Sequence, residues 1–575
     1  MSSSKRMSFL RREDRLAAWS VGLLLLAVYV ASFNGLPTVP DAEVEFQTTS
    51  ALVRTGRADL GGTPESEALI EARFGVAEGT GARAGRWYSR YGIGQALVGV
   101  PLYVIGSALA AALPGYEELH ARDSPYGPQR SEYFAHLAVG LRNPLLGAWT
   151  AFLLVLTARR LGVGRSAAWW CGMGYGLTTF AWAQARAGLS DVQATFFLVL
   201  AFHGIVRLRS HFARLRAPRV GDRLGIGAYL AAAVATRVAV LPAVLALLGI
   251  AVFVLHAGKR DLRRAWVAQG VERPPRVFLI GVMAALPLVL GTAALAVWND
   301  LRFGDVFESG YGSGLDLAGF FAGNPLHGAA SLFASPGRGL LWMAPALLLL
   351  PLALARERIY GDVFWSRATL AIALAVIVPA ACMRGWHGAW TYGPRYLLPL
   401  LPFAWLGVGL AFESRRGRRA AWRRVGAALF ALGLTVQLGG ALVDAPTHLD
   451  LGLQAAREVW PTPAGVEESE MEERRFDDLQ WDWRFAAPWA HLRILRHRVA
   501  GLGERFQAEA LYLVETSTAL EPVHARQRGF AHLAWIDLHR RLGGPLWPAA
   551  LVCALLVLAE MVLGLESSHG GGGRA

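Results

Sequence analysis

Carboxylates stand close together after the first apolar stretch of the chain, where PTVPDAEVEFQ contains Asp41, Glu43 and Glu45. A second acidic turn, RAGLSDVQA, places Asp191 directly before another apolar run. A carboxylate at the edge of a membrane can act as a general base or bind a metal ion. Because Asp41 and Asp191 both precede helical stretches, they could equally cap helices. The residues alone leave both interpretations open.

Several arginines are expected at the ends of apolar segments, on the same side as these acids: Arg142, Arg237, Arg302, Arg338 and Arg395. A guanidinium binds phosphate through two parallel hydrogen bonds, so converging arginines would suit a diphosphate or a phosphate ester. Any single arginine can instead extend toward lipid headgroups, which is the simpler interpretation of Arg302. For Arg237 and Arg395 we expect a functional role.

The composition indicates a membrane protein, because 54% of the 575 residues are hydrophobic. The formal net charge of +14 comes from arginines in short loops beside apolar segments. This pattern follows the positive-inside rule, so we expect no nucleic-acid partner. The cysteines, Cys171, Cys382 and Cys553, offer neither a disulfide framework nor a zinc-ligand spacing.

Basic clusters predict the topology, and they occur at residues 5–15, 159–165, 207–223, 259–276, 356–367 and 415–424. If all of them face the cytoplasm, an even number of crossings separates neighbouring clusters. Apolar segments supply that number at 16–33, 135–157, 166–185, 190–207, 224–237, 238–257, 277–297, 339–356, 367–383, 395–412, 424–443 and 546–564. The sequence therefore predicts an all-α polytopic protein with about 12 transmembrane helices and both termini inside. Residues 93–113 would invert every later loop if they crossed, so we expect an interfacial helix on the outer surface.

The predicted spans divide the chain into five regions. Residues 1–33 form the cytoplasmic N-terminus and first span, 34–134 a long outer loop with surface helices, and 135–442 the multi-span core. Residues 443–545 form a small outer cap, and 546–575 form the last span and cytoplasmic tail. We expect the acidic run EESEMEERRFDD (467–478) of the cap to be a solvated face.

The order of the motifs resembles the GT-C superfamily of integral-membrane glycosyltransferases. It is most similar to the polyprenyl-phosphate-dependent, family-39-like bacterial group related to protein mannosyltransferases and aminoarabinose transferases. The resemblance covers most of residues 10–445 and is carried by order and spacing rather than by any single motif. It rests on Asp41 followed by EFQTTSALVRTG, then WYSRYGIGQALVGVPLYVIG, TARRLG, AWAQARAGLSDVQATFFLVLA, ATRVAVLP, WNDLRFGDVFESGYG, LFASPGRGLLWMAP and WHGAWTYGPRYLLPLLPF.

The resemblance implies roles for the acids and for one arginine. Asp41 would be the base that activates the acceptor, or would bind a metal that assists. Asp191 would support the acceptor or the metal, and Arg237 would hold the carrier phosphate. Members of this group often have two adjacent acids, whereas here Ala42 intervenes and Glu43 is the next carboxylate. Any divalent metal would therefore be held by Asp41, Glu43 and Asp191.

The other candidate residues would shape a substrate pocket. The resemblance implies that Arg395, Trp386 and Trp390 line the donor site, where a sugar can stack on indole. Further candidates for substrate binding are Tyr88, Tyr91, His387 and Arg338.

The implied reaction moves a hexose or pentose from a polyprenyl-phosphate carrier, such as undecaprenyl phosphate, to an acceptor on the outer face of the bacterial inner membrane. The acceptor could be a lipid, a glycan or a protein. A transporter or flippase of a lipid-linked sugar, without bond cleavage, would explain the spans and arginines equally well. It explains the long first loop and the cap less well, because such segments are unusual in a carrier. The Ala42 interruption also leaves room for an inactive member of an envelope-assembly complex.

Overall fold

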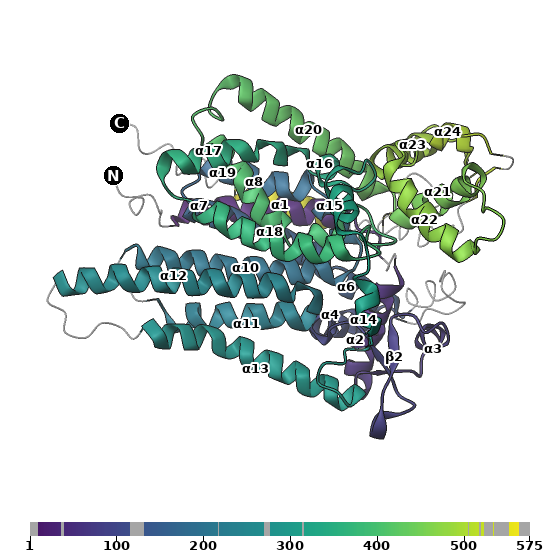
Figure 1. The fold of residues 1–575 in the computed structure, drawn as a ribbon, viewed down its shortest axis with the longest axis horizontal. Coiled ribbons are helices and arrows are strands. Elements are labelled where there is room, and N and C mark those ends of the chain that lie inside the picture. Colours follow the sequence, from purple (N-terminus) through teal and green to yellow (C-terminus); the bar gives the residue numbers. More distant parts are fainter. Residues whose placement is uncertain are drawn as a thin grey trace.

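The computed structural model describes residues 10–35, 39–114, 132–214, 216, 218–268, 277–312, 315–503, 505–516, 519–521, 533, 551–559 and 561–562. Its long helices run roughly parallel in one bundle, with a small sheet and a separate group of helices at one end (Figure 1). The bundle helices are α1 (Arg12–Ala31), α7 (Arg142–Arg160), α8 (Arg165–Leu177), α9 (Ala181–Arg186), α10 (Ser190–Phe212), α11 (Val220–Thr236), α12 (Leu241–Ala268), α13 (Val277–Phe303), α16 (Leu340–Met343), α17 (Leu350–Tyr360), α18 (Phe364–Cys382), α19 (Leu401–Phe412) and α20 (Ala420–Leu442).

Shorter elements connect these helices or cover their ends. They are α2 (Pro40–Thr55), α3 (Pro64–Glu71), η2 (Gly81–Arg83), α4 (Ile93–Ala112), α6 (Tyr133–Gly140), η3 (Val238–Val240), α14 (Leu315–Phe320), α15 (Pro325–Ala334), η4 (Pro345–Leu349) and η5 (Arg395–Leu397). The last group is α21 (Ala445–Val459), α22 (Glu468–Trp481), α23 (Ala487–Val499) and α24 (Ala508–Tyr512).

The loops that carry the arginine clusters contact one another at one end of the bundle, which we call the basic end. Arg159 Nε lies 2.7 Å from Asp14 Oδ1, which joins the first two clusters. Arg209 Nη2 lies 2.9 Å from Asp362 Oδ1, which joins two later ones. These contacts are expected if the clusters share one side of the membrane. We call the opposite end, which carries α21–α24, the cap end (Figure 1).

Within the described residues, 8 helices are long and apolar enough to cross a membrane: Arg12–Ala31, Ile93–Ala112, Tyr133–Arg160, Ser190–Phe212, Val238–Gly258, Leu279–Phe303, Phe364–Cys382 and Ala420–Leu442. All but Ile93–Ala112 coincide with expected spans. Four other expected spans, at 166–185, 224–237, 339–356 and 395–412, form shorter or broken helices, and the expected span at 546–564 is described only in part. The protein is a mostly helical, multi-pass membrane protein, and the count of twelve crossings stays a prediction.

Both ends of α4 contact elements of the cap end. A Cβ at Gly94 would lie 2.7 Å from the backbone carbon of Ala235, in the last turn of α11. A Cβ at Gly106 would lie 2.5 Å from the Cα of Ala135 in α6. Glycine at these positions therefore allows close backbone packing at both ends of the helix. The contacts support a course across the cap end rather than through the bundle, although α4 is long enough to span.

A small β-sheet lies in the first outer loop, so the all-α prediction was wrong there. Its strands β1 (Asp59–Leu60), β2 (Val76–Glu78) and β3 (Trp87–Ser89) are antiparallel in the order β1-β3-β2, with Ala77 opposite Tyr88. Aromatic residues such as Trp87 and Tyr88 favour strands. The sheet holds the segment that continues into Tyr91 and α4.

The region expected to be a cap is helical and has its own hydrophobic core, which includes Leu449, Phe485 and Tyr512. The acidic run forms most of α22, and its carboxylates are exposed or half-buried, as the solvated-face prediction requires. Arg475 is buried and donates a hydrogen bond to the Trp460 carbonyl at 2.9 Å. The helix therefore buries one side while its acids cover the other.

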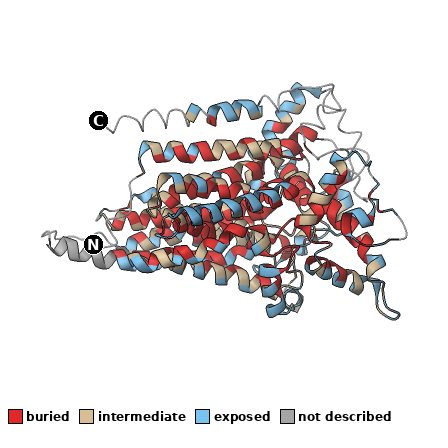
Figure 2. Cartoon of the chain, turned by 90° about the horizontal axis from the view of Figure 1, so that it is seen from above, coloured by how far each residue is buried: buried red, intermediate tan, exposed pale blue. Residues whose placement is uncertain are grey.

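Buried residues concentrate in the middle of the bundle, and exposed residues lie along its outer faces (Figure 2). Several exposed residues are apolar, such as Leu290 and Leu370, each 60% exposed. An apolar outer face is expected where helices meet lipid chains.

Candidate active site at the cap end

Two acid–arginine pairs meet at the cap end of the bundle. Asp41 Oδ2 lies 3.7 Å from Arg395 Nη1, and Asp191 Oδ2 lies 3.4 Å from Arg237 Nη1. The ring of Tyr396 joins the pairs, because its centroid is 5.1 Å from Arg395 Cζ and 5.7 Å from Arg237 Cζ. Four residues singled out from the sequence thus form one cluster.

Each of these residues lies where a helix begins or ends. Asp41 follows Pro40 in the first turn of α2, and Asp191 lies in the first turn of α10. The partial positive charge of a helix N-terminus favours both carboxylates. Arg237 occupies the extended break between α11 and η3, with φ −155°. Arg395 begins η5.

The turn before Asp191 is held by side chains from neighbouring helices. Gln95 Nε2 and Arg142 Nη2 donate hydrogen bonds to the Gly188 carbonyl at 2.7 and 3.2 Å. Asn143 Nδ2 donates to the Leu189 carbonyl at 2.8 Å. Arg142 therefore positions the backbone that carries Asp191.

Ala42 brings the helix of Asp41 close to the turn of Asp191. A Cβ at Gly188, where φ is +76°, would lie 3.0 Å from Ala42 Cβ. Ala42 is 7% exposed and packs with Leu189. Position 42 therefore faces an apolar contact, where a second carboxylate would have no room.

Glu43 and Glu45 lie on different faces of α2. Glu43 Oε1 accepts a hydrogen bond from Gln47 Nε2 at 2.9 Å and lies 3.2 Å from His136 Nε2. Glu45 instead follows Asp41 by one helical turn, which places the two on the same face. The helical spacing of 41 and 45 was the signal that could have identified Glu45. In the part of the chain that the structure describes, no group of three or more His, Cys, Asp or Glu residues could hold a metal ion.

Glu45 is a buried carboxyl group, with 4% of its surface exposed. Burial raises its pKa to about 8, a shift that Arg142 reduces and the charge of Asp41 increases. Its Oε1 has no hydrogen-bond partner among the described residues. At neutral pH this group is therefore largely protonated.

Tyr91 lies beside Asp41. Burial raises the pKa of its phenol, and the charge of Asp41 and a hydrogen bond to that carboxylate raise it further. The ring of Tyr311, a residue that we did not single out, lies 6.4 Å from that of Tyr91. The phenol stays protonated and can orient the Asp41 carboxylate.

Arg395 has few close partners for its charge. Its Nη2 donates to Tyr396 Oη at 3.4 Å, and its buried Nε has no hydrogen-bond partner among the described residues. Burial lowers its pKa, but Tyr396, Asp191 and Asp41 together raise it well above the usual value. Gly388, with φ +72°, lies against the side chain, since a Cβ there would be 2.8 Å from Arg395 Cγ. The guanidinium is thus charged, largely buried and incompletely hydrogen-bonded.

Arg338 and His387 lie at the junction between the core and the cap. Arg338 donates hydrogen bonds to the carbonyls of His387 and Ala389, and to Gln480 Oε1 at 3.0 Å. Its hydrogen bonds hold the loop that precedes Arg395. Burial and Arg338 lower the pKa of His387 to about 3, so this imidazole is neutral and adds no positive charge.

The two candidate tryptophans also lie near this junction. Trp386 is 3% exposed and donates to Asp477 Oδ1 of α22 at 2.7 Å. Trp390 packs beside Ala42 and lies 6.0 Å from the ring of Phe476. Trp386 is therefore engaged with the cap, whereas Trp390 lies between the cap and the helix of Asp41.

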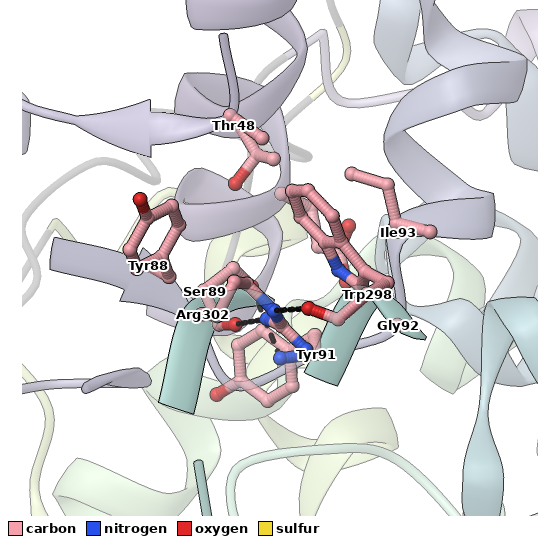
Figure 3. A pocket seen from close by; sticks show the side chains of 10 residues that line it. Thr48, Tyr88, Ser89, Tyr91, Gly92, Ile93, Trp298 and Arg302 are labelled. Carbon is pink, nitrogen blue, oxygen red and sulfur yellow. Dashed lines mark hydrogen bonds between the residues drawn. The ribbon is translucent and has the colours of Figure 1, made fainter. Parts of the chain in front are cut away.

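A small pocket opens beside Glu45, between α2, the Tyr88–Ile93 segment and the end of α13 (Figure 3). Tyr88 is buried there, with its ring 6.4 Å from that of Trp298. Arg302 is 5% exposed and donates to the Ser89 carbonyl at 2.9 Å. The expectation that Arg302 extends to lipid headgroups was therefore wrong.

Residues 104–291, about a third of the chain, match the profile of the family described as dolichyl-phosphate-mannose-protein mannosyltransferase, PMT. Over this segment the chain is similar to the PMT family, whose description names a dolichyl-phosphate-mannose donor. The matched segment contains Asp191 and Arg237, whereas Asp41 and Arg395 lie outside it. No curated protein sequence matches the chain.

Two solved structures show a distant likeness. ArnT from Cupriavidus metallidurans, in the apo state, has a TM-score of 0.42 and 14% identity, over 95% of this chain and 75% of ArnT. The oligosaccharyltransferase AglB from Archaeoglobus fulgidus, in complex with an inhibitory peptide and a dolichol-phosphate, has a TM-score of 0.43 and 11% identity. This match covers 80% of this chain and 59% of AglB. We base no assignment on these similarities.

Proposed function

We propose that this glycosyltransferase transfers a sugar from a polyprenyl-phosphate carrier to a hydroxyl-bearing envelope acceptor at the outer face of the bacterial inner membrane. The cap end would face the periplasm or the exterior, because the arginine clusters gather at the opposite end. The acceptor would be a lipid, a glycan or a protein. The family match favours this enzyme over a carrier that moves a lipid-linked sugar intact.

The incomplete hydrogen bonding of Arg395 carries the proposal. Its nearest acidic oxygen is 3.7 Å away, whereas Arg338 donates to three acceptors. A buried charged group without close partners costs free energy, which an anionic ligand can offset. The planar guanidinium matches a phosphate group. Arg237, on the other side of Tyr396, would contact the same phosphate.

Asp41 is the best-placed base in the cluster. Its side chain is 26% exposed, so an acceptor hydroxyl can reach it, whereas that of Asp191 is 1% exposed. In the proposed step the acceptor oxygen forms a bond to the anomeric carbon of the sugar, and its proton passes to Asp41. The bond from that carbon to the phosphate oxygen breaks, and its electron pair leaves with the carrier phosphate. Arg395 and Arg237 would stabilise the phosphate charge as it increases.

We assign Asp191 a positioning role. Its only ion-pair contact among the described residues is Arg237, which also donates to Ser190 Oγ at 3.2 Å. Both contacts involve Arg237 Nη1, so Asp191 would orient that side of the guanidinium and Nη2 would face the donor phosphate. Tyr91 would orient Asp41 in the same way.

The test uses purified protein in nanodiscs with radiolabelled undecaprenyl-phosphate hexoses and pentoses and an envelope extract. We expect the wild type to release the sugar from at least one carrier, and Asp41→Asn to release none while keeping its thermal stability. Saturable binding without release from any donor by the wild type would contradict the proposal and favour transport. Full activity of Asp41→Asn would refute the role of Asp41.

A further inference from the structure

Two buried polar atoms without hydrogen-bond partners belong to residues that line the same small pocket. One is Glu45 Oε1, and the other is Nε1 of Trp298 near the end of α13. Neither atom has a partner among the residues that the structure describes. Buried polar atoms are nearly always hydrogen-bonded, so two unpaired atoms around one pocket indicate a ligand group.

Arg302, another polar side chain that lines this pocket, already has hydrogen-bond partners. Arg302 donates to the Ser89 carbonyl at 2.9 Å and to Asn299 Oδ1 at 2.8 Å. Its guanidinium also lies 4.9 Å from the ring centroid of Trp298, a contact that fixes the indole (Figure 3). Arg302 therefore supports the pocket wall and leaves the indole N–H and the Glu45 carboxyl for a ligand.

The chemistry of the two groups defines what can bind. An indole N–H is a donor only, and a carboxyl oxygen accepts. A hydroxyl group satisfies both, because its oxygen accepts from the indole while its hydrogen is donated to the carboxyl oxygen. A phosphate group is too large for the space of about 10 Å³, and an alkyl group would leave both atoms unpaired. The pocket has room for one water-sized group, about 10 Å³, which suits a hydroxyl rather than a whole sugar ring.

We propose that Glu45 and Trp298 form a subsite for one hydroxyl group of the enzyme's substrates, one helical turn from Asp41. The inference rests on the proposed function, since it places a substrate hydroxyl next to the transfer site. The hydroxyl belongs either to the transferred sugar or to a polyhydroxylated acceptor. In both cases the subsite sets the distance and orientation of that substrate relative to Asp41.

The experiment compares Trp298→Phe, Glu45→Ala and Glu45→Gln in the full-length protein in nanodiscs. Phenylalanine keeps the aromatic face for Arg302 but removes the N–H, and glutamine, like the protonated carboxyl group, can both donate and accept a hydrogen bond. We expect Trp298→Phe and Glu45→Ala each to lower kcat/KM about 10-fold or more, the loss for an unpaired buried group. Glu45→Gln should stay within about threefold of the wild type at neutral pH, because it can replace the hydrogen bond. The double variant Trp298→Phe/Glu45→Ala should lose little more than either single one, since both act on one hydroxyl.

Binding and hydrolysis distinguish the two sources of the hydroxyl. If it belongs to the sugar, Trp298→Phe weakens binding of undecaprenyl-phosphate hexoses but not of undecaprenyl phosphate, and it slows sugar release to water. If it belongs to the acceptor, donor binding and release to water are unchanged while transfer to the envelope extract falls. The binding comparison still tests the subsite if the wild type releases no sugar. Two results would overturn the proposal. One is an equal loss of binding affinity for undecaprenyl phosphate and for its sugar-linked forms. The other is that neither Trp298→Phe nor Glu45→Ala changes binding, sugar release or transfer.

Discussion

Replacing Ala42 by glutamate creates the adjacent acid pair that the resemblance to the GT-C group would favour, yet we expect it to inactivate the protein. Ala42 is 7% exposed, and its Cβ faces Gly188 so closely that a Cβ there would lie at 3.0 Å. A longer side chain must push α2 away from the turn that carries Asp191. Overpacking of this kind costs about 1–3 kcal/mol, and burying a carboxylate against Leu189 adds a similar or larger amount.

The two costs together predict a loss of at least about 2 kcal/mol in the free energy of unfolding if α2 stays in place. If α2 moves instead, Asp41 moves with it, and a displacement of about 1 Å at a reacting group can lower the rate about 100-fold. We therefore expect Ala42→Glu to lower either the unfolding temperature or the rate of sugar release, or both.

Thermal unfolding in nanodiscs and radiolabelled sugar release measure the two effects. Ala51→Glu is the matched control, because it adds the same side chain to the same helix at a partly exposed position. The control should leave both quantities near the wild-type values. An Ala42→Glu protein with normal stability and normal or higher activity would show that position 42 opens to the site, and would refute the packing argument.

Three further predictions follow from single contacts. Because the pKa of Glu45 is raised to about 8 in the folded protein from 4.5, wild-type stability should fall as pH rises from 4.5 to 8. Glu45→Gln should remove that part of the pH dependence of the unfolding temperature. If the unfolding temperatures of wild type and Glu45→Gln changed in parallel with pH, the raised pKa of Glu45 would be contradicted. Gly388→Ala should raise the KM for the donor about 10-fold or more by displacing Arg395, whereas Gly465→Ala, also at positive φ but with open space around it, should not. Arg338→Lys should lower the unfolding temperature and speed proteolysis at the cap junction, because lysine cannot donate in the arginine fork to the His387 and Ala389 carbonyls. Unchanged proteolysis would show that those hydrogen bonds do not hold the cap.

The separation of acids from arginine clusters could be predicted from the sequence, because charge beside apolar segments is a local pattern. The sequence analysis expected Asp41, Asp191, Arg237 and Arg395 on the same, outer side of the predicted spans, and the four residues lie in one cluster. The role of Ala42 could not be predicted, because it depends on a contact with Gly188 that only the folded chain creates. Helical spacing could have separated Glu43 from Glu45.

Tertiary contacts also decided the roles of residues that looked alike in sequence. Arg338 and Arg395 both follow glycine- or proline-containing turns, but Arg338 donates to loop carbonyls, whereas Arg395 Nε has no hydrogen-bond partner in the described part of the chain. No local signal distinguishes them, since the partners of Arg338 come from another loop and from the cap. The short β3 strand was missed because a strand of three residues, Trp87–Ser89, carries little periodicity.

The central claim is that Asp41 removes the proton of the acceptor during transfer from a polyprenyl-phosphate donor. The most direct measurement compares the rate of sugar transfer by Asp41→Asn and Glu43→Gln, two amide variants on the same helix, alongside the wild type. Glu43 faces His136 and Gln47 rather than the cluster, and its amide variant is expected to keep most of the wild-type rate. We predict that Asp41→Asn still binds the undecaprenyl-phosphate sugar but transfers none of it. Equal rates for the two variants, or loss of transfer by Glu43→Gln alone, would contradict the account.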